Sequence, residues 1–122
     1  MNFCIRIGSI NLNSSKSDLN KGLFIDFIYN NDLDIVFAQE VCYENFNFIL
    51  THNVCVNYDK GSSGTAILFR KNFNAQYPIF DPNGRISSII INDINLINVY
   101  AHSGSNRKKS GRNFLRITSL FI

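Results

Sequence analysis

Two short stretches of the sequence decide the fold: Ser9-Ile10-Asn11-Leu12-Asn13 and Phe37-Ala38-Gln39-Glu40. Each ends an apolar run with a polar side chain, a pattern typical of a buried strand that emerges at the edge of a sheet. The apolar run 35–38 is long enough for a buried strand and too short for a helix, so Glu40 is expected at a rigid strand end. Asn11 and Glu40 are therefore the first candidates for a functional site.

The segment that joins these stretches has the pattern of a helix. Residues 2–10 alternate apolar and polar side chains and predict a strand, and 35–39 predict a second one. Between them, Ser17 can cap a helix whose sheet-facing side chains are expected to be Leu19, Leu23, Phe27 and Ile28. A strand–helix–strand order favours parallel strands whose carboxyl ends share one edge, which would bring Asn11 and Glu40 side by side.

A carboxylate and an amide at one sheet edge suit a hard cation. Mg²⁺ takes one or two protein carboxylates and completes its shell with water and phosphate oxygens, so Glu40 and Asn11 could suffice as part of such a site. Carboxylates at strand ends are also common where no metal binds. Spacing alone leaves both interpretations open.

The pattern of the remaining sequence predicts mainly β-strands. Residues 43–50 predict one or two helical turns, and strands are expected at 51–58, 64–70, 77–80, 85–91 and 94–100, arranged as an antiparallel meander. The turn residues Asp81-Pro82-Asn83-Gly84 and Asn92-Asp93 support the hairpins. Residues 107–122 combine apolar and basic side chains in a pattern that predicts a helix.

Length and composition indicate one globular domain over residues 1–122. The net charge of +3 is too mild to identify a nucleic-acid-binding protein, but five basic residues gather near the end of the chain, which favours either phosphate contacts or a solvated helix face: Arg107, Lys108, Lys109, Arg112 and Arg116. Cys4, Cys42 and Cys55 are odd in number and lack metal-site spacing, so we expect reduced core thiols in an intracellular protein. No apolar run is long enough to span a membrane.

Four motifs taken in order resemble one family. Ser-Ile-Asn-Leu-Asn, Phe-Ala-Gln-Glu, Ser-Ser-Gly-Thr-Ala-Ile-Leu at 62–68 and Asn-Val-Tyr-Ala-His-Ser-Gly at 98–104 resemble the endonuclease/exonuclease/phosphatase superfamily. The resemblance is greatest to the apurinic-type endonuclease domain of non-LTR (LINE-like) retrotransposon proteins and covers about residues 3–114. It implies an α/β (α+β) fold, a four-layer α/β sandwich of the DNase I-like type.

The resemblance also implies an activity and residue roles. The activity would be hydrolysis of phosphodiester bonds in DNA with Mg²⁺, or Mn²⁺ in its place, as cofactor. Asn11 would help bind substrate or the metal and its water, Glu40 would be the metal ligand, and Tyr100 would contact the scissile phosphate. Asn13 and Arg107 would contact nucleic acid. Gly64 matches a glycine of the third motif and is expected to be structural.

Two motifs of the family are absent from this chain. The family's general base is a His in a Ser-Asp-His motif, preceded by a Gly-Asp-x-Asn segment, and neither motif occurs here. His52 and His102 are expected to be ordinary sheet and loop residues rather than bases. The sequence thus resembles the amino-terminal half of the domain, cut after its first sheet and part of the following helix. We expect an uncovered apolar sheet face, marginal stability or aggregation, and negligible catalysis by this chain.

Three functions remain open from the sequence. The first is a fragment of a retroelement endonuclease that nicks target DNA in the nucleus, followed in the full protein by a reverse transcriptase domain. The second is a phosphatase or sphingomyelinase of the same superfamily, which the basic cluster disfavours because it suits extended polyanions. The third is a non-enzymatic remnant that binds nucleic acid.

Overall fold

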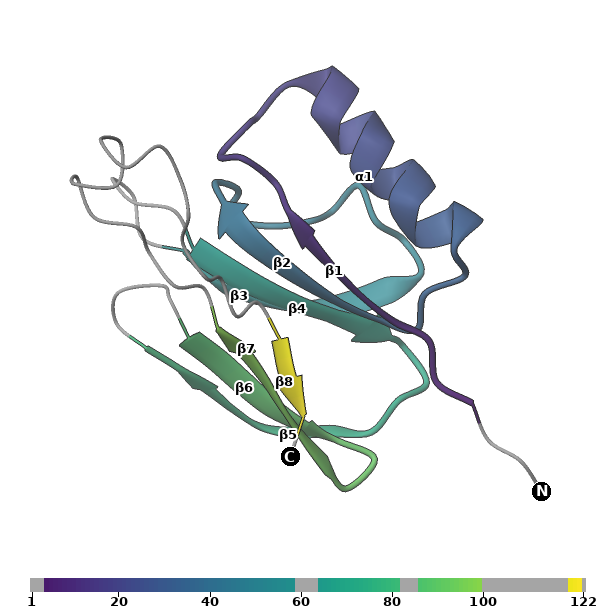
Figure 1. The fold of residues 1–122 in the computed structure, drawn as a ribbon, viewed down its shortest axis with the longest axis vertical. Helices are drawn as coiled ribbons and strands as arrows, with labels where there is room; N and C mark the ends of the chain where they lie inside the picture. The colour runs from purple at the N-terminus through teal and green to yellow at the C-terminus, as the bar shows by residue number, and fades with distance from the viewer. Residues whose placement is uncertain (1–3, 59–63, 82–85, 100–118, 122) are drawn as a thin grey trace, which may run out of the picture.

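The computed structural model describes residues 4–58, 64–81, 86–99 and 119–121 (Figure 1). The described elements follow in chain order: β1 (Ile7–Asn11), α1 (Asp18–Asn30), β2 (Ile35–Val41), β3 (His52–Asn57), β4 (Gly64–Arg70), β5 (Ala75–Phe80), β6 (Ile86–Ile91), β7 (Ile94–Val99) and β8 (Ser119–Phe121). No helix among the described residues has the length and apolarity that crossing a membrane requires.

The strands form two four-stranded sheets, with orders β1-β2-β4-β3 and β5-β6-β7-β8. In the first sheet β1 runs parallel to β2, as predicted, while β2 and β3 both run antiparallel to β4. Strands β1, β2 and β3 therefore point the same way, and their carboxyl ends lie along one edge. In the second sheet all neighbouring strands are antiparallel.

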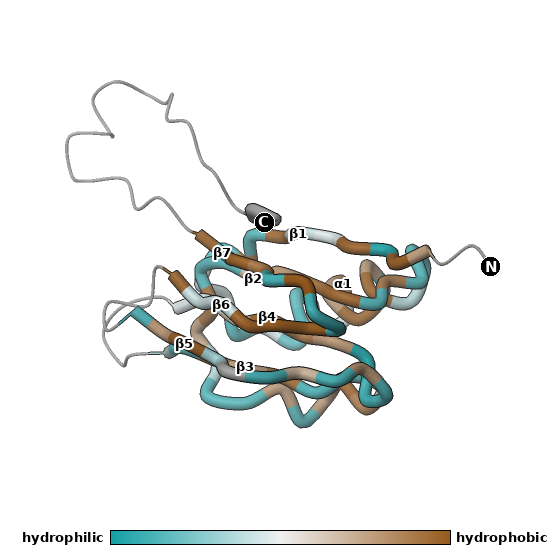
Figure 2. Tube along the Cα trace, turned by 90° about the horizontal axis from the view of Figure 1, so that it is seen from below, coloured by the Kyte–Doolittle hydropathy of each residue, from teal (hydrophilic) through white to brown (hydrophobic). Residues whose placement is uncertain are grey.

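The alternation of side chains along β2 and β4 separates two cores. Val36, Ala38, Ala66 and Leu68 belong to a cluster on the α1 side of the first sheet. Side chains of the opposite parity, among them Phe37 and Ile67, pack with Ile89, Ile91 and Leu96 of the second sheet. The middle of strand β4 is hydrophobic in Figure 2, where both faces of the strand are buried.

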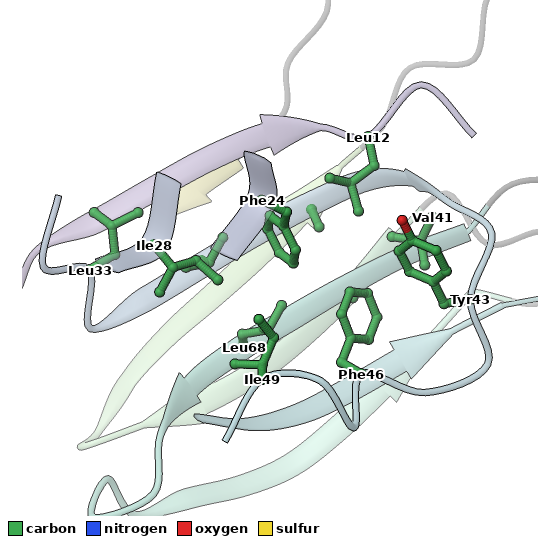
Figure 3. Packing of buried hydrophobic residues seen from close by; sticks show 12 residues of the cluster. Leu12, Phe24, Ile28, Leu33, Val41, Tyr43, Phe46, Ile49 and Leu68 are labelled. Carbon is green, nitrogen blue, oxygen red and sulfur yellow. The ribbon is translucent and has the colours of Figure 1, made fainter. Parts of the chain in front are cut away.

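Helix α1 is capped as predicted by Ser17, whose hydroxyl oxygen accepts a hydrogen bond from the Asn20 amide at 3.1 Å. The predicted face is partly wrong, because Leu19 and Leu23 are 72% and 56% exposed. Phe24 and Ile28 are the buried pair, and Figure 3 shows both pointing from the helix into the cluster that contains Leu68. Leu23 lies about 100° around the helix from Phe24 and so faces away from the sheet.

The segment 42–50 covers the remainder of the first sheet without forming a helix, which corrects the prediction of one or two helical turns. Aromatic contacts hold it instead. The ring of Tyr43 makes edge contacts with Phe46 and Phe48, at centroid distances of 5.3 and 5.6 Å, and Phe46 contacts Phe24 of α1 at 5.9 Å. Figure 3 places Tyr43 and Val41 at one end of this cluster and Leu33 at the other.

The second sheet corrects two further predictions. The predicted meander is divided, because β3 and β4 join the first sheet while β5, β6 and β7 form the second. The chain is also not cut after one sheet: the apolar face of the first sheet is covered by the second (Figure 1). The uncovered apolar surface lies elsewhere, with Ile79, Phe80, Ile86 and Ile94 all exposed on β5, β6 and β7. Aggregation of the isolated chain stays a prediction.

Other boundaries differ at the two ends of the chain. The expected strand covered residues 2–10, but β1 begins only at Ile7. Its pairing with the neighbouring strand β2 starts there, opposite Ile35. The helix predicted over 107–122 is wrong at Ser119–Phe121, which form β8 beside β7. The rest of that prediction lies outside the described residues.

The three cysteines are free thiols, which agrees with the prediction that they are reduced. Cys42 and Cys55 are half-buried and pack against the two cores, whereas Cys4 is exposed and its predicted core position is wrong. Cys4 precedes the first described strand and so lies outside both packed layers.

His52 is a structural residue, as predicted. It is buried; its Nε2 lies 2.9 Å from the Leu33 carbonyl oxygen and its Nδ1 lies 2.7 Å from the Thr51 hydroxyl oxygen. A carbonyl only accepts, so Nε2 carries the proton and Nδ1 accepts from the hydroxyl. Burial, as the largest effect, lowers the pKa of His52, so this neutral form is favoured.

Gly64 begins β4 at a point where no side chain fits. An added Cβ would overlap the backbone carbonyl oxygen of Asn57 on β3, the neighbouring strand. We expect Gly64→Ala to lower the free energy of unfolding by about 3 kcal/mol, because backbone atoms of two paired strands must separate. Urea unfolding followed by circular dichroism measures it. Gly22→Ala is the matched control, since the space around Gly22 is open and the change favours the helix. A Gly64→Ala protein as stable as the unsubstituted chain would refute a steric role for this glycine.

Candidate functional site

The candidate site begins with an irregularity in β2. Gln39 pairs with Thr65 and Val41 pairs with Gly64, so Glu40 is an extra residue, a β-bulge. Its φ of 52° lies in the left-handed region, which costs a non-glycine residue about 1–3 kcal/mol. Val41 then packs on the α1 side, although uninterrupted alternation would send it to the other face. The bulge thus frees the Glu40 side chain from the alternation of the strand at the sheet edge.

Asn11 lies beside Glu40, which confirms the predicted placement. Its Nδ2 donates a hydrogen bond of 2.9 Å to Oε2 of Glu40, in a half-buried position. The Oδ1 atom of Asn11 accepts from the Asn13 amide at 2.7 Å. With both ends of the amide engaged, the orientation of Asn11 is defined, and the carboxylate of Glu40 is oriented with it.

The loop after β1 is attached to the same bulge through its backbone. The Leu12 amide donates to the Gln39 carbonyl at 2.8 Å, and the Ser14 amide donates to the Glu40 carbonyl at 3.0 Å. Asn13 and Ser14 have φ values of 56° and 53°, which fold the loop tightly against the end of β2. The side chain of Asn13 is exposed at this edge, where a ligand could reach it.

A buried polar network lies one residue away, between the two sheets. Gln39 on β2 donates to Oδ1 of Asn98 on β7 at 3.1 Å and to the Ser9 hydroxyl oxygen on β1 at 3.1 Å. Asn98 donates in turn to the carbonyl oxygens of Ala38 and Ala66, both at 3.1 Å. Gln39 and Asn98 are fully buried. Directional bonds of this kind help to define the register of two sheets that otherwise pack mainly through apolar side chains.

Sequence reasoning missed the role of this network. Gln39 and Asn98 both stand in the quoted motifs, yet nothing in a single sequence distinguishes a polar residue at a sheet edge from one between two sheets. The one available signal was a polar residue inside an otherwise apolar strand, because such a residue needs partners when it is buried. The other predicted site residues, Tyr100 and Arg107, lie outside the described residues, as does His102.

The oxygen ligands that Glu40 and Asn11 offer suit a hard cation that needs few ligands from the protein. Within the described ranges, no group of three or more His, Cys, Asp or Glu side chains could hold a metal ion, so a site of the zinc type does not arise there. One oriented carboxylate with an amide beside it is what Mg²⁺ or Mn²⁺ uses when water and phosphate supply the remaining ligands.

The comparisons with known proteins rest on structure alone. No protein-family model matches the sequence, and no curated protein does either. An AP endonuclease from Archaeoglobus fulgidus is similar in structure, with a TM-score of 0.66 and 26% identity over 80% of this chain and 41% of that one. TDP2 from D. rerio, solved with a single-strand DNA product, has a TM-score of 0.58 and 19% identity over 86% of this chain and 49% of that one.

Both comparisons agree on the architecture, and in each the chain spans less than half the length of the protein it matches. The described residues supply an α1 layer and two packed sheets, which are parts of the predicted sandwich. The chain therefore has the DNase I-like α+β fold, the fold of the endonuclease/exonuclease/phosphatase superfamily that its motifs resemble.

Proposed function

We propose that this chain carries the metal-binding edge of a Mg²⁺-dependent DNA endonuclease that hydrolyses phosphodiester bonds, of the retroelement type that nicks target DNA. The observation that carries the proposal is the Asn11–Glu40 hydrogen bond at a strained bulge, on the edge where β1 and β2 end. Strain at a non-glycine residue is kept where the surrounding structure requires it, and such residues cluster at functional sites. The AP endonuclease similarity supports the nuclease class.

The chain's own residues define what this edge would do. Glu40, with Asn11 as its neighbour, would hold the cation, which would neutralise charge on the phosphoryl centre and lower the pKa of bound water. Asn11 would orient the carboxylate through its Nδ2 atom, and Asn13 would lie at the position of the nucleic acid. Because the chain lacks the Ser-Asp-His and Gly-Asp-x-Asn motifs, we propose that it binds metal without completing the reaction.

A second candidate is a nucleic-acid-binding protein without catalysis. The basic residues of the sequence favour it, and the TDP2 structure with single-strand DNA is compatible with either candidate. The endonuclease and the non-catalytic binding protein would both contact a longer polyanion than a phosphatase does. The reverse transcriptase partner and the nuclear location remain part of the proposal for the retroelement protein.

The metal site can be tested with Mn²⁺ as a paramagnetic probe. In nuclear magnetic resonance spectra of the chain, we expect Mn²⁺ to broaden the amide signals of 11–14 and 40–42 first, because these residues surround the Glu40 carboxylate. An excess of Mg²⁺ should restore the signals by competition. The reference is the region around Asp34, whose carboxylate is held by Arg70 at the opposite edge. Broadening that begins there, or uniformly over the exposed acids, would contradict the proposed site.

A further inference from the structure

A concave surface lies on the same edge as Glu40. It has a volume of about 340 Å³, and we call it the edge groove; its lining includes Lys16, Lys21, Tyr43, Glu44, Phe48 and Tyr58. Three segments meet there: the β1–α1 connection with the first turn of α1, the segment after β2, and the residue after β3. Since β1, β2 and β3 run in the same direction, all three segments follow carboxyl strand ends.

The edge groove combines cations with aromatic rings. The ammonium group of Lys21 lies 5.3 Å from the ring centroid of Tyr43 and 5.4 Å from that of Phe48, distances at which a cation is attracted to the ring face. These contacts hold the charge of Lys21 at the groove wall instead of letting it move freely in solvent. Lys16 is exposed nearby on the loop that is bonded to the Glu40 bulge.

The balance of charge in the groove favours an anion. Two lysines and one acidic residue, Glu44, are among the residues that line the groove. Burial is the largest cause that raises the pKa of Tyr43, so its phenol stays protonated and adds no negative charge. Phe48 and Tyr58 are half-buried and present aromatic surface in the same cavity. An occupant with one phosphate and one flat ring would match both parts of this lining.

We propose that the edge groove binds one unpaired nucleotide of a single-stranded nucleic acid, with Lys16 and Lys21 at the phosphates and Tyr58 stacked on the base. The volume is at the lower end of the range for small-ligand pockets, about 300–1,000 Å³. Stacking on aromatic side chains needs a base whose faces are open, so a paired base in a duplex cannot use it. The inference rests on the proposed function in one respect only: it takes the sheet edge at Glu40 as the place where the nucleic acid lies.

The test measures binding of a labelled oligothymidylate and of a matching duplex by fluorescence anisotropy, in EDTA so that no metal contributes. We expect tighter binding of the single strand. Tyr58→Leu should weaken it at least about five-fold, the lower end of what losing one base–aromatic stack costs, whereas Tyr58→Phe should retain it. The combined change Lys16→Gln and Lys21→Gln should make the dependence on salt shallower. The negative slope of the logarithm of the association constant against the logarithm of the salt concentration should shrink in magnitude by about 1.4, or 0.7 per phosphate contact.

Controls separate this proposal from others. Lys71→Gln removes a charge after β4, at the opposite edge, and should leave affinity and slope unchanged. Melting curves confirm that each variant folds; if Tyr58→Leu does not, the two lysine substitutions still decide the question. Equal binding of duplex, an unchanged salt slope, or displacement by phosphatidylserine vesicles in preference to DNA would each overturn the proposal. The groove is tested in EDTA and the metal site with Mn²⁺, so failure of the metal site and failure of the groove give different results.

Discussion

Glu40→Gln is expected to lower the affinity of the chain for Mg²⁺ at least about tenfold, so that binding is no longer measurable. The substitution keeps the size of the side chain and still allows Asn11 to donate its hydrogen bond, so only the negative charge is removed. Mg²⁺ depends on that charge, because it otherwise keeps its own water shell. Isothermal titration calorimetry with Mg²⁺, and with Mn²⁺ in parallel, measures the effect.

The control for Glu40→Gln is Asp26→Asn, which removes an exposed carboxylate from α1 and should leave binding unchanged. A second comparison uses the strain at the bulge. Both Glu40→Ala and Glu40→Gly should lose binding, but the glycine variant should be more stable than the alanine variant by about 1 kcal/mol, since glycine accepts the positive φ without penalty. If Glu40→Gln binds Mg²⁺ as the unsubstituted chain does, this carboxylate is not the metal ligand.

Asn98→Leu is expected to lower the free energy of unfolding by about 3 kcal/mol. The leucine fills a similar volume but cannot bond to the carbonyl oxygens of Ala38 and Ala66 or accept from Gln39. Each buried polar group left without its partner costs about 1–3 kcal/mol. Chemical unfolding monitored by circular dichroism and by fluorescence of the tyrosines measures the loss.

Asn95→Leu is the matched control for the network, because Asn95 lies on the same strand with an exposed side chain. That change should stay within about 0.5 kcal/mol of the unsubstituted protein. An Asn98→Leu variant that is destabilised no more than Asn95→Leu would show that the two sheets do not depend on this network for their register. The Asn11–Glu40 bond lies wholly within the first sheet, so Mg²⁺ binding per folded molecule should survive Asn98→Leu.

Local pattern was sufficient where it depended on neighbours in the chain. The Ser17 cap, the buried strand ending near Glu40 and the parallel pairing that brings Asn11 beside it all follow from residue spacing and from the handedness of a short crossover. The structural role of Gly64 was expected from the family resemblance, and its missing side chain leaves room for a carbonyl of the adjacent strand.

Tertiary structure decided what depends on residues distant in the sequence. Leu19 and Leu23 have the same spacing as a buried helical face, yet the packing of Phe24 and Ile28 against the first sheet left them exposed. Contacts between strands likewise decided the division of the expected meander into two sheets, the burial of Gln39 against Asn98 and the bulge at Glu40. The sequence by itself thus determined which residues end the strands, because periodicity is a local property. Only the folded structure determined how those ends are oriented, because hydrogen bonds between sheets join residues about 60 positions apart.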